Sequence, residues 1–302
     1  MIIALLSQLA FAQECPKIKI NKIAKIQSEK LDEVSGMVIS DSMIWLHNDS
    51  GDSASIYAIS KEGIYLGKTD IKQAYARDWE DMSSFEIEIE QPQTGTPKPT
   101  VKKKFLLIGD IGDNHERKET LELYVVPEPS KPEDIDLSYS FTIQYDQIGP
   151  KDSEAMFVDP TSNELIIYTK GREGTTYWLK APLPSEKATI KMSVFHQEQN
   201  YDVPPTTRRQ MARLITSADI SPDGRWIVTR DYLTAKMFYH PEGQDIATTV
   251  TQTPCHIPLP LQEQGETIAF APDGKSLWTL SEGQKPILYQ IELHFPKSSD
   301  SN

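Results

Sequence analysis

Long apolar runs, basic residues and familiar catalytic motifs are all scarce in this sequence. No apolar run among its 302 residues reaches the roughly 18 residues that a membrane-spanning helix needs, so no membrane span is expected. The 31 Lys and Arg are outnumbered by 44 Asp and Glu, which gives a net charge of −13. This balance argues against a nucleic acid polymer as partner, because phosphate binding needs a basic surface. No G-x-S-x-G, H-E-x-x-H, P-loop or Rossmann motif occurs.

The composition still describes a folded protein. Apolar residues make up 38% of the chain, a low share for a large core, but 9% aromatic residues and five Trp exclude simple disorder. An acidic surface suits solubility, and acidic pockets suit cations.

The first twelve residues predict export. Residues 1–12 are apolar and end in Ala10, Phe11 and Ala12, which is a small-residue cleavage pattern after a short apolar segment. We therefore expect a signal peptide over 1–12 and a secreted or periplasmic protein, the alternative being a buried strand. No Cys follows directly, so no lipid anchor is expected. The only two cysteines are Cys15 and Cys255; in an exported chain they predict one disulfide, the alternative being two unpaired thiols.

A repeat of short apolar strands runs through the chain. Each of the first four units gives four strands, and the fifth gives three. The units start at Ser35, Glu80, Glu154, Ser217 and Glu266. Residues 17–27 alternate between polar and apolar and supply the strand that the fifth unit lacks. Pro-Asp-Gly turns at 221–224 and 271–274 separate strands, and the best helix candidate is 206–215.

This plan predicts an all-β fold, a five-bladed β-propeller in one domain over residues 13–302. The N-terminal strand would close the ring and remove the exposed sheet edges. The long second and third units leave a six-bladed ring open as the second interpretation, and a two-domain sandwich as the third. The length alone would suggest about two domains. We expect a monomer.

The first residue of each unit predicts a cation site. Antiparallel pairing brings the starts of the inner strands and the ends of the second strands to one face. Three carboxylates and two hydroxyls meet there, and like charges in a narrow channel repel. Oxygen ligands alone favour Ca²⁺ over Zn²⁺. The alternatives are acids that pair with Lys or Arg, or that stay solvated. The predicted metal ligands are Ser35, Glu80, Glu154, Ser217 and Glu266.

The ends of the second strands predict a ligand-binding rim above the metal. Acids and bases mix there, and such a mixture suits a small anionic molecule. The alternative is that these Asx-rich turns are purely structural. The candidate rim residues are His47, Asp49, Arg77, Asp78, Asp110, Asp113, Asn114, Lys170 and Arg230.

The Ser, Glu, Glu, Ser, Glu ring resembles the calcium-activated nucleotidase (apyrase) family of secreted five-bladed propellers. The resemblance implies one central Ca²⁺ with one ligand from each blade, at the five ring positions. The segments HNDSGD, ARDWEDM, GDIGDN, SEAMFVDP, SADISPDG and GETIAF look like a group of bacterial propeller proteins of unassigned function. That second likeness spans most of the chain and implies the fold without an activity. Phytase-like and esterase-like propellers are a weaker similarity.

Two functions follow as expectations. The first is an exported calcium-binding propeller that acts as a non-catalytic ligand-binding or structural module. The second is a calcium-dependent hydrolase of phosphate esters or anhydrides. In that case Arg77, Lys170 and Arg230 would steady developing charge, and Asp78 or Asp110 could act as base. Propellers host both roles, so the fold alone does not choose between them.

Overall fold

The structure is a computed structural model that describes residues 14–90, 100–199 and 207–296. The signal peptide predicted over 1–12 lies outside the described residues. Regular structure in the described part is almost entirely β-strand, and the all-β prediction is confirmed. Its two helices, α1 (Arg208–Met211) and α2 (Ile246–Thr249), have four residues each. None of the helices in this part is long and apolar enough to cross a membrane.

The described strands form four hydrogen-bonded sheets. The first has the order β2 (Val34–Ile39), β3 (Ile44–Asn48), β4 (Ser55–Ile59), β5 (Tyr65–Lys72) and β9 (Ile135–Asp136). An eight-stranded sheet has the order β11 (Ser153–Val158), β12 (Glu164–Thr169), β13 (Thr175–Pro182), β14 (Thr189–Gln199), β10 (Tyr139–Tyr145), β8 (Leu121–Pro127), β7 (Thr100–Asp110) and β6 (Asp81–Glu90). The third has the order β15 (Ile215–Ile220), β16 (Trp226–Asp231), β17 (Thr234–Tyr239) and β18 (Cys255–Pro258). The fourth has the order β1 (Lys17–Lys25), β21 (Ile287–His294), β20 (Ser276–Thr279) and β19 (Ala269–Phe270).

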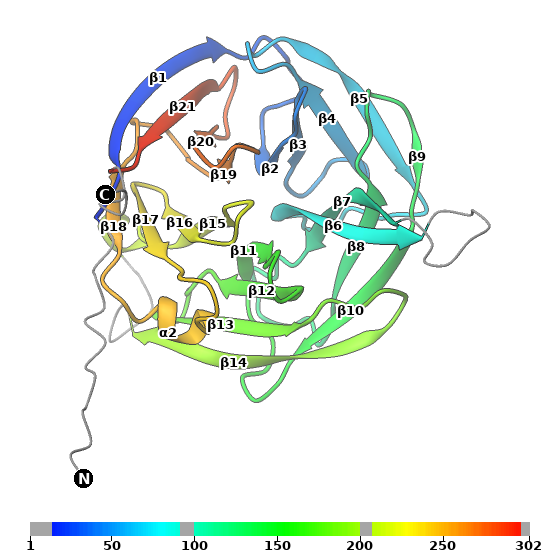
Figure 1. Cartoon of the computed structure of the whole chain (residues 1–302). Coiled ribbons are helices and arrows are strands. Elements are labelled where there is room, and N and C mark those ends of the chain that lie inside the picture. The colour runs from blue at the N-terminus through cyan, green and yellow to red at the C-terminus, as the bar shows by residue number, and fades with distance from the viewer. Residues whose placement is uncertain (1–13, 91–99, 200–206, 297–302) are drawn as a thin grey trace.

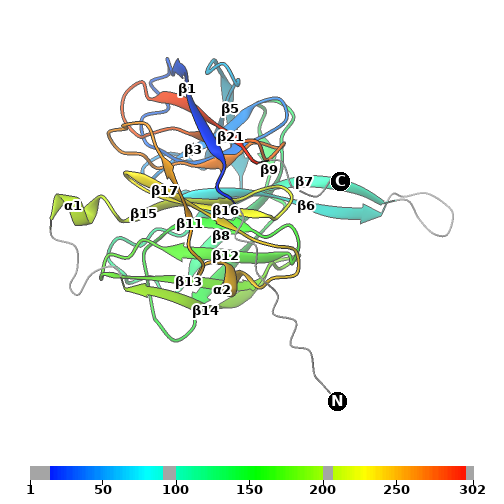
Figure 2. The ribbon, with the colours of Figure 1, turned by 60° about the vertical axis from the view of Figure 1, so that its left-hand side comes forward.

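The strands that start the five sequence units lie at the centre of the molecule (Figure 1). Around this centre β2 contacts β6, β6 contacts β11, β11 contacts β15, β15 contacts β19, and β19 returns to β2. The later strands of each unit lie progressively farther out (Figure 1). Figure 2, turned by 60°, shows α1 on one side of the molecule and the paired strands β6 and β7 extending on the other. The eight-stranded sheet contains two of these units, because β10 and β14 pair in parallel at their outer edges. The alternation in the sequence did not reveal this pairing.

Five apolar clusters fill the spaces between neighbouring units. Because successive strand residues point to opposite faces, a strand between two neighbours contributes to two clusters. In β3, Ile44 and Leu46 pack toward the fifth unit while Trp45 packs toward the second. Burial on both faces explains why the inner strands read as continuous apolar runs.

The predicted closing strand is confirmed. Residues 17–25 form β1, which pairs antiparallel with β21 and so joins the last sheet of the chain. Cys15, just before β1, is disulfide-bonded to Cys255 in β18, with their Cα atoms 5.5 Å apart. The predicted disulfide is therefore confirmed, and it ties the closing strand to the adjacent third sheet.

Three segments add detail to the sequence-based expectations. The helix expected over 206–215 covers only Arg208–Met211, because β15 already begins at Ile215. The long second unit is explained by β6 and β7, which pair out to Glu90 and Thr100 as an extended hairpin. Before β18, the chain forms α2, and the Asp245 side chain caps this helix by accepting a hydrogen bond from the Ala247 N–H.

Candidate metal centre

The five predicted metal ligands lie at the same end of the five inner strands and are almost fully buried. Each has an exposed fraction of at most 3%. The pairing of β2 with β3 shifts register at Ser35, and that of β11 with β12 shifts at Glu154. Such bulges re-aim a side chain and are common beside functional sites.

The three ring glutamates are close enough to influence one another. Glu154 raises the pKa of Glu80, and Glu266 raises that of Glu154, while burial is the larger cause for both. The ammonium of Lys170, in the loop after β12, forms an ion pair with Glu154 and also interacts with Glu80 and Glu266. One lysine therefore offsets part of the charge of three buried carboxyl groups.

The two ring serines hold neighbouring inner strands together. The hydroxyl of Ser35 donates a hydrogen bond of 2.5 Å to the backbone oxygen of Glu80. Ser217 Oγ accepts one of 3.3 Å from the N–H of Ile268 and lies 3.4 Å from Asp81 Oδ2. These contacts account for the serines without a cation, so their role as metal ligands stays a prediction.

Asp81 is a buried acid that sequence reasoning missed. Its carboxylate accepts hydrogen bonds from the N–H groups of Met82, Met156 and Ala218, at 2.9, 3.0 and 3.4 Å. It therefore connects β6, β11 and β15. The sequence signal was the second acid directly after Glu80, at the first position of the inner strand.

Two groups of three carboxylates meet at the mouth, and these buried and half-buried acids could hold a metal ion. Asp49, Asp78 and Glu80 form one group, and Glu80, Asp152 and Glu154 form the other. Within each group the oxygens lie within 4.8 Å of one another. At an effective dielectric constant near 20, two unit charges at that distance repel by about 3 kcal/mol. Glu80 belongs to both groups, so it carries the largest share of this repulsion.

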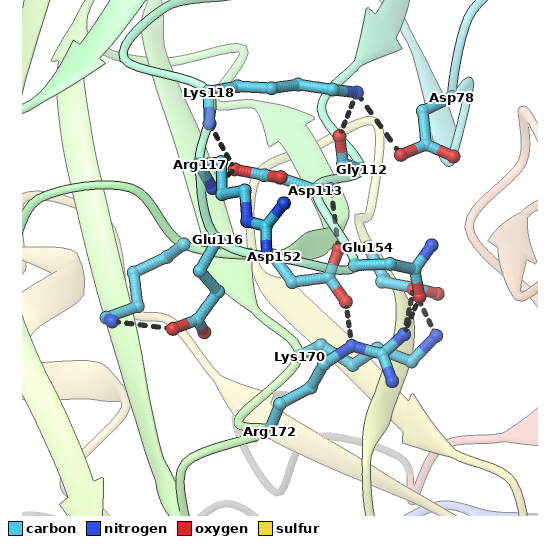
Figure 3. Close-up of polar contacts among 12 residues, drawn as sticks. Asp78, Gly112, Asp113, Glu116, Arg117, Lys118, Asp152, Glu154, Lys170 and Arg172 are labelled. Atoms are coloured by element: carbon cyan, nitrogen blue, oxygen red, sulfur yellow. Dashed lines mark hydrogen bonds and ion pairs between the residues drawn. The ribbon is translucent and has the colours of Figure 1, made fainter.

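Lysine and arginine side chains form ion pairs with three of the five acids in these groups (Figure 3). Lys118 Nζ lies 3.2 Å from Asp78 Oδ2 and also donates to the backbone oxygen of Gly112. Arg172 pairs with Asp152, and Lys170 with Glu154. Within the described part of the chain, the side chains of Asp49 and Glu80 form no ion pair. The donors are all oxygen atoms, as a hard cation such as Ca²⁺ prefers.

Glycine makes room for this arrangement beside Glu80. A Cβ on Gly112 would lie 2.2 Å from Glu80 Oε1 and 2.7 Å from Asp78 Cγ. Both carboxylates therefore converge on the space that the missing side chain leaves. The second glycine of GDIGDN is the sequence feature that indicates this space, but a glycine in such a segment is equally typical of a tight turn.

The rim residues on the loop after β7 support the site in different ways. Asp113 accepts hydrogen bonds of 2.6 Å from the N–H groups of Arg117 and Lys118, and its own N–H donates to Asp152 at 2.8 Å. Asn114 accepts from Arg172. Asp113 thus positions the loop that delivers Lys118 to Asp78.

Asp110 differs from these residues because it keeps a free oxygen. Its Oδ1 accepts a hydrogen bond of 3.2 Å from the N–H of Asp78, while its buried Oδ2 has no hydrogen-bond partner. Burial raises the pKa of Asp110 to about 6. Arg77 is exposed next to it and interacts with it electrostatically.

The other two rim candidates, His47 and Arg230, lie in the interior. Burial lowers the pKa of His47 to about 4, so its ring is neutral near pH 7. Arg230 donates hydrogen bonds to the backbone oxygen of Thr267 at 2.9 Å and to the hydroxyl of Thr279 at 2.6 Å. Both are at most 1% exposed, and a part for them in ligand binding stays a prediction.

Comparison with known proteins adds no family: no protein-family model matches the chain, and no curated protein matches it.

Proposed function

We propose that this chain is an exported five-bladed β-propeller that binds Ca²⁺ at one end of its channel. The closed circle of contacts among the five inner strands supports the propeller interpretation, as do the five apolar clusters between neighbouring units. The disulfide supports export, because such bonds persist in oxidising compartments. The function is then that of a binding or structural module in which a metal fixes the blades.

The observation that carries this proposal is the carboxylate of Glu80. It is 2% exposed and forms no hydrogen bond or ion pair within the described residues, although two other acids face it in each group. Burying such a charge without a partner is costly. A calcium ion held by Glu80, Glu154 and Glu266, with the hydroxyls of Ser35 and Ser217, would supply the missing positive charge.

The same end of the channel fits a small anionic ligand. The side chains of Lys118 and Arg172 are 34% and 32% exposed, so their cationic heads border the metal site while remaining accessible. A bound cation between them would extend the positive surface that an anion requires. No reaction is needed for this role.

Thermal unfolding with calcium and with a chelator tests the proposal. A ligand that binds only the folded state at about 100 times its dissociation constant adds about 2.7 kcal/mol, which corresponds to a rise in Tm of roughly 5 °C. Glu80→Gln should lose most of this rise. Glu242→Gln, an exposed acid paired with Arg225, is the matched control and should keep it. A wild-type Tm that does not respond to calcium or chelator would overturn the proposal.

Asp110 favours one second function, a calcium-dependent hydrolase of phosphate esters or anhydrides. A carboxylate with a pKa of about 6 and a free oxygen suits a general base near neutral pH. Phosphate release from p-nitrophenyl phosphate and from nucleoside di- and triphosphates, with and without calcium, tests it. Asp110→Asn should abolish turnover and keep the calcium-dependent rise in Tm. No release from any of these substrates would refute the hydrolase.

A further inference from the structure

We infer that the channel mouth binds two divalent cations that share Glu80 as a ligand. One would lie with Glu80, Asp152 and Glu154, and the other with Asp49, Asp78 and Glu80. This inference rests on the proposed calcium binding and adds a second ion, two of whose ligands, Asp49 and Asp78, lie outside the predicted ring.

The position of Glu80 is the first support. Its oxygens lie within 4.8 Å of ligand atoms in both groups, which makes it a member of each. It is 2% exposed and, among the described residues, no hydrogen bond or ion pair to its carboxylate exists. A carboxylate has two oxygens with several lone pairs, so a single one can serve two cations.

The distribution of positive charge is the second support. The group with Asp152 and Glu154 already contains Arg172 and Lys170. The group with Asp49 and Asp78 has one ion pair among the described residues, between Lys118 and Asp78 at 3.2 Å, and Lys170 interacts with Asp49 and Glu80 without forming an ion pair. The second group is therefore the less compensated of the two, and one ion in the central ring would leave Asp49 without an ion pair.

The shape of the second group is the third support. Gly112 has no side chain where Glu80 Oε1 and the Asp78 carboxylate converge. Asp49 approaches the same point from the end of β3, and among the described residues its side chain accepts a hydrogen bond only from the adjacent N–H of Ser50. Its carboxylate is thus available to a ligand, and it is not needed to hold another strand.

Calcium stoichiometry measured by isothermal titration and by equilibrium dialysis tests the inference. Wild-type protein should bind two ions. Asp49→Asn should bind one, because it removes a charge from the second group and leaves Asp152 and Glu154 intact. Asn can keep the bond to the Ser50 N–H, so the fold should persist, and equal Tm values in chelator check this. Asp78→Asn is the second variant for the same group, and Glu242→Gln is the control that should bind two.

The outcomes separate this inference from the proposed function. One ion on the wild type, or two ions on both Asp49→Asn and Asp78→Asn, would overturn the second site and leave calcium binding in place. No ion on the wild type would overturn both. Terbium luminescence titrated against calcium gives an independent count, and Glu80→Gln should weaken both sites by at least tenfold.

Discussion

Removal of the disulfide should destabilise the protein strongly, because the bridge closes almost the whole chain. Cys15 and Cys255 are 240 residues apart. In the chain-entropy model a loop of this length contributes about 5 kcal/mol, by restricting the unfolded chain. The double variant Cys15→Ser, Cys255→Ser should therefore lose up to that amount of unfolding free energy.

Because β1 is only partly buried, removal of the disulfide should also destabilise this strand locally. Of its nine residues none is fully buried, and Ile20 is 38% exposed. The strand is therefore held mainly by its ladder to β21 and by the bridge next to it. Without the bridge, the amides of residues 17–25 should exchange with deuterium much faster than those of β20.

Urea unfolding of the oxidised wild type and of the double variant measures the effect. With an m-value of about 3 kcal/mol/M, a loss of about 5 kcal/mol lowers the midpoint by roughly 1.5 M. A reductant should move the wild type toward the variant and leave the variant unchanged. Equal midpoints for the two proteins, together with unchanged exchange in β1, would refute the reasoning from ring closure.

Two further predictions concern the two ends of the channel. Gly112→Ala should weaken calcium binding by at least tenfold, because the added Cβ would lie 2.2 Å from Glu80 Oε1. Calcium titration measures this affinity, and an unchanged affinity would contradict the convergence of Glu80 and Asp78 beside Gly112. Asp219 lies at the other end, where it lines a cavity of about 660 Å³, and burial raises its pKa from 3.8 to about 7. A protein in which folding raises the pKa of an acid loses stability as the pH rises from the unfolded-state pKa to the folded-state pKa of that acid. In the presence of chelator, the unfolding free energy of Asp219→Asn minus that of the wild type should therefore increase by up to about 4 kcal/mol as the pH rises from 3.8 to about 7. A difference that does not vary with pH would contradict the raised pKa of Asp219.

Local patterns in the sequence were sufficient for three features of the fold. Alternation over 17–27 predicted the closing strand, since a strand on the outer edge has one face toward solvent. The Pro-Asp-Gly turn at 221–224 was predicted because glycine accepts a positive φ, and Gly224 has a φ of 71°. The pair Cys15 and Cys255 required no choice of connectivity, because two cysteines permit only one bridge.

The parallel pairing of β10 with β14 could not be predicted in the same way. Thr142 and Thr189 are 47 residues apart and meet only because two units lie side by side. The register between strands of different units depends on packing across the whole ring, so it cannot be predicted from the sequence of a single strand.

The sequence by itself determined which residues start the inner strands, and so which acids could meet at the channel mouth. Only the tertiary structure decided their partners: Lys170 forms an ion pair with Glu154 and Lys118 with Asp78, while Glu80 forms none among the described residues. It also placed Asp49 and Asp152 beside Glu80, which the ring pattern had not included. The physical reason is that Coulomb energy depends on distances of a few ångströms between loops that lie far apart along the chain.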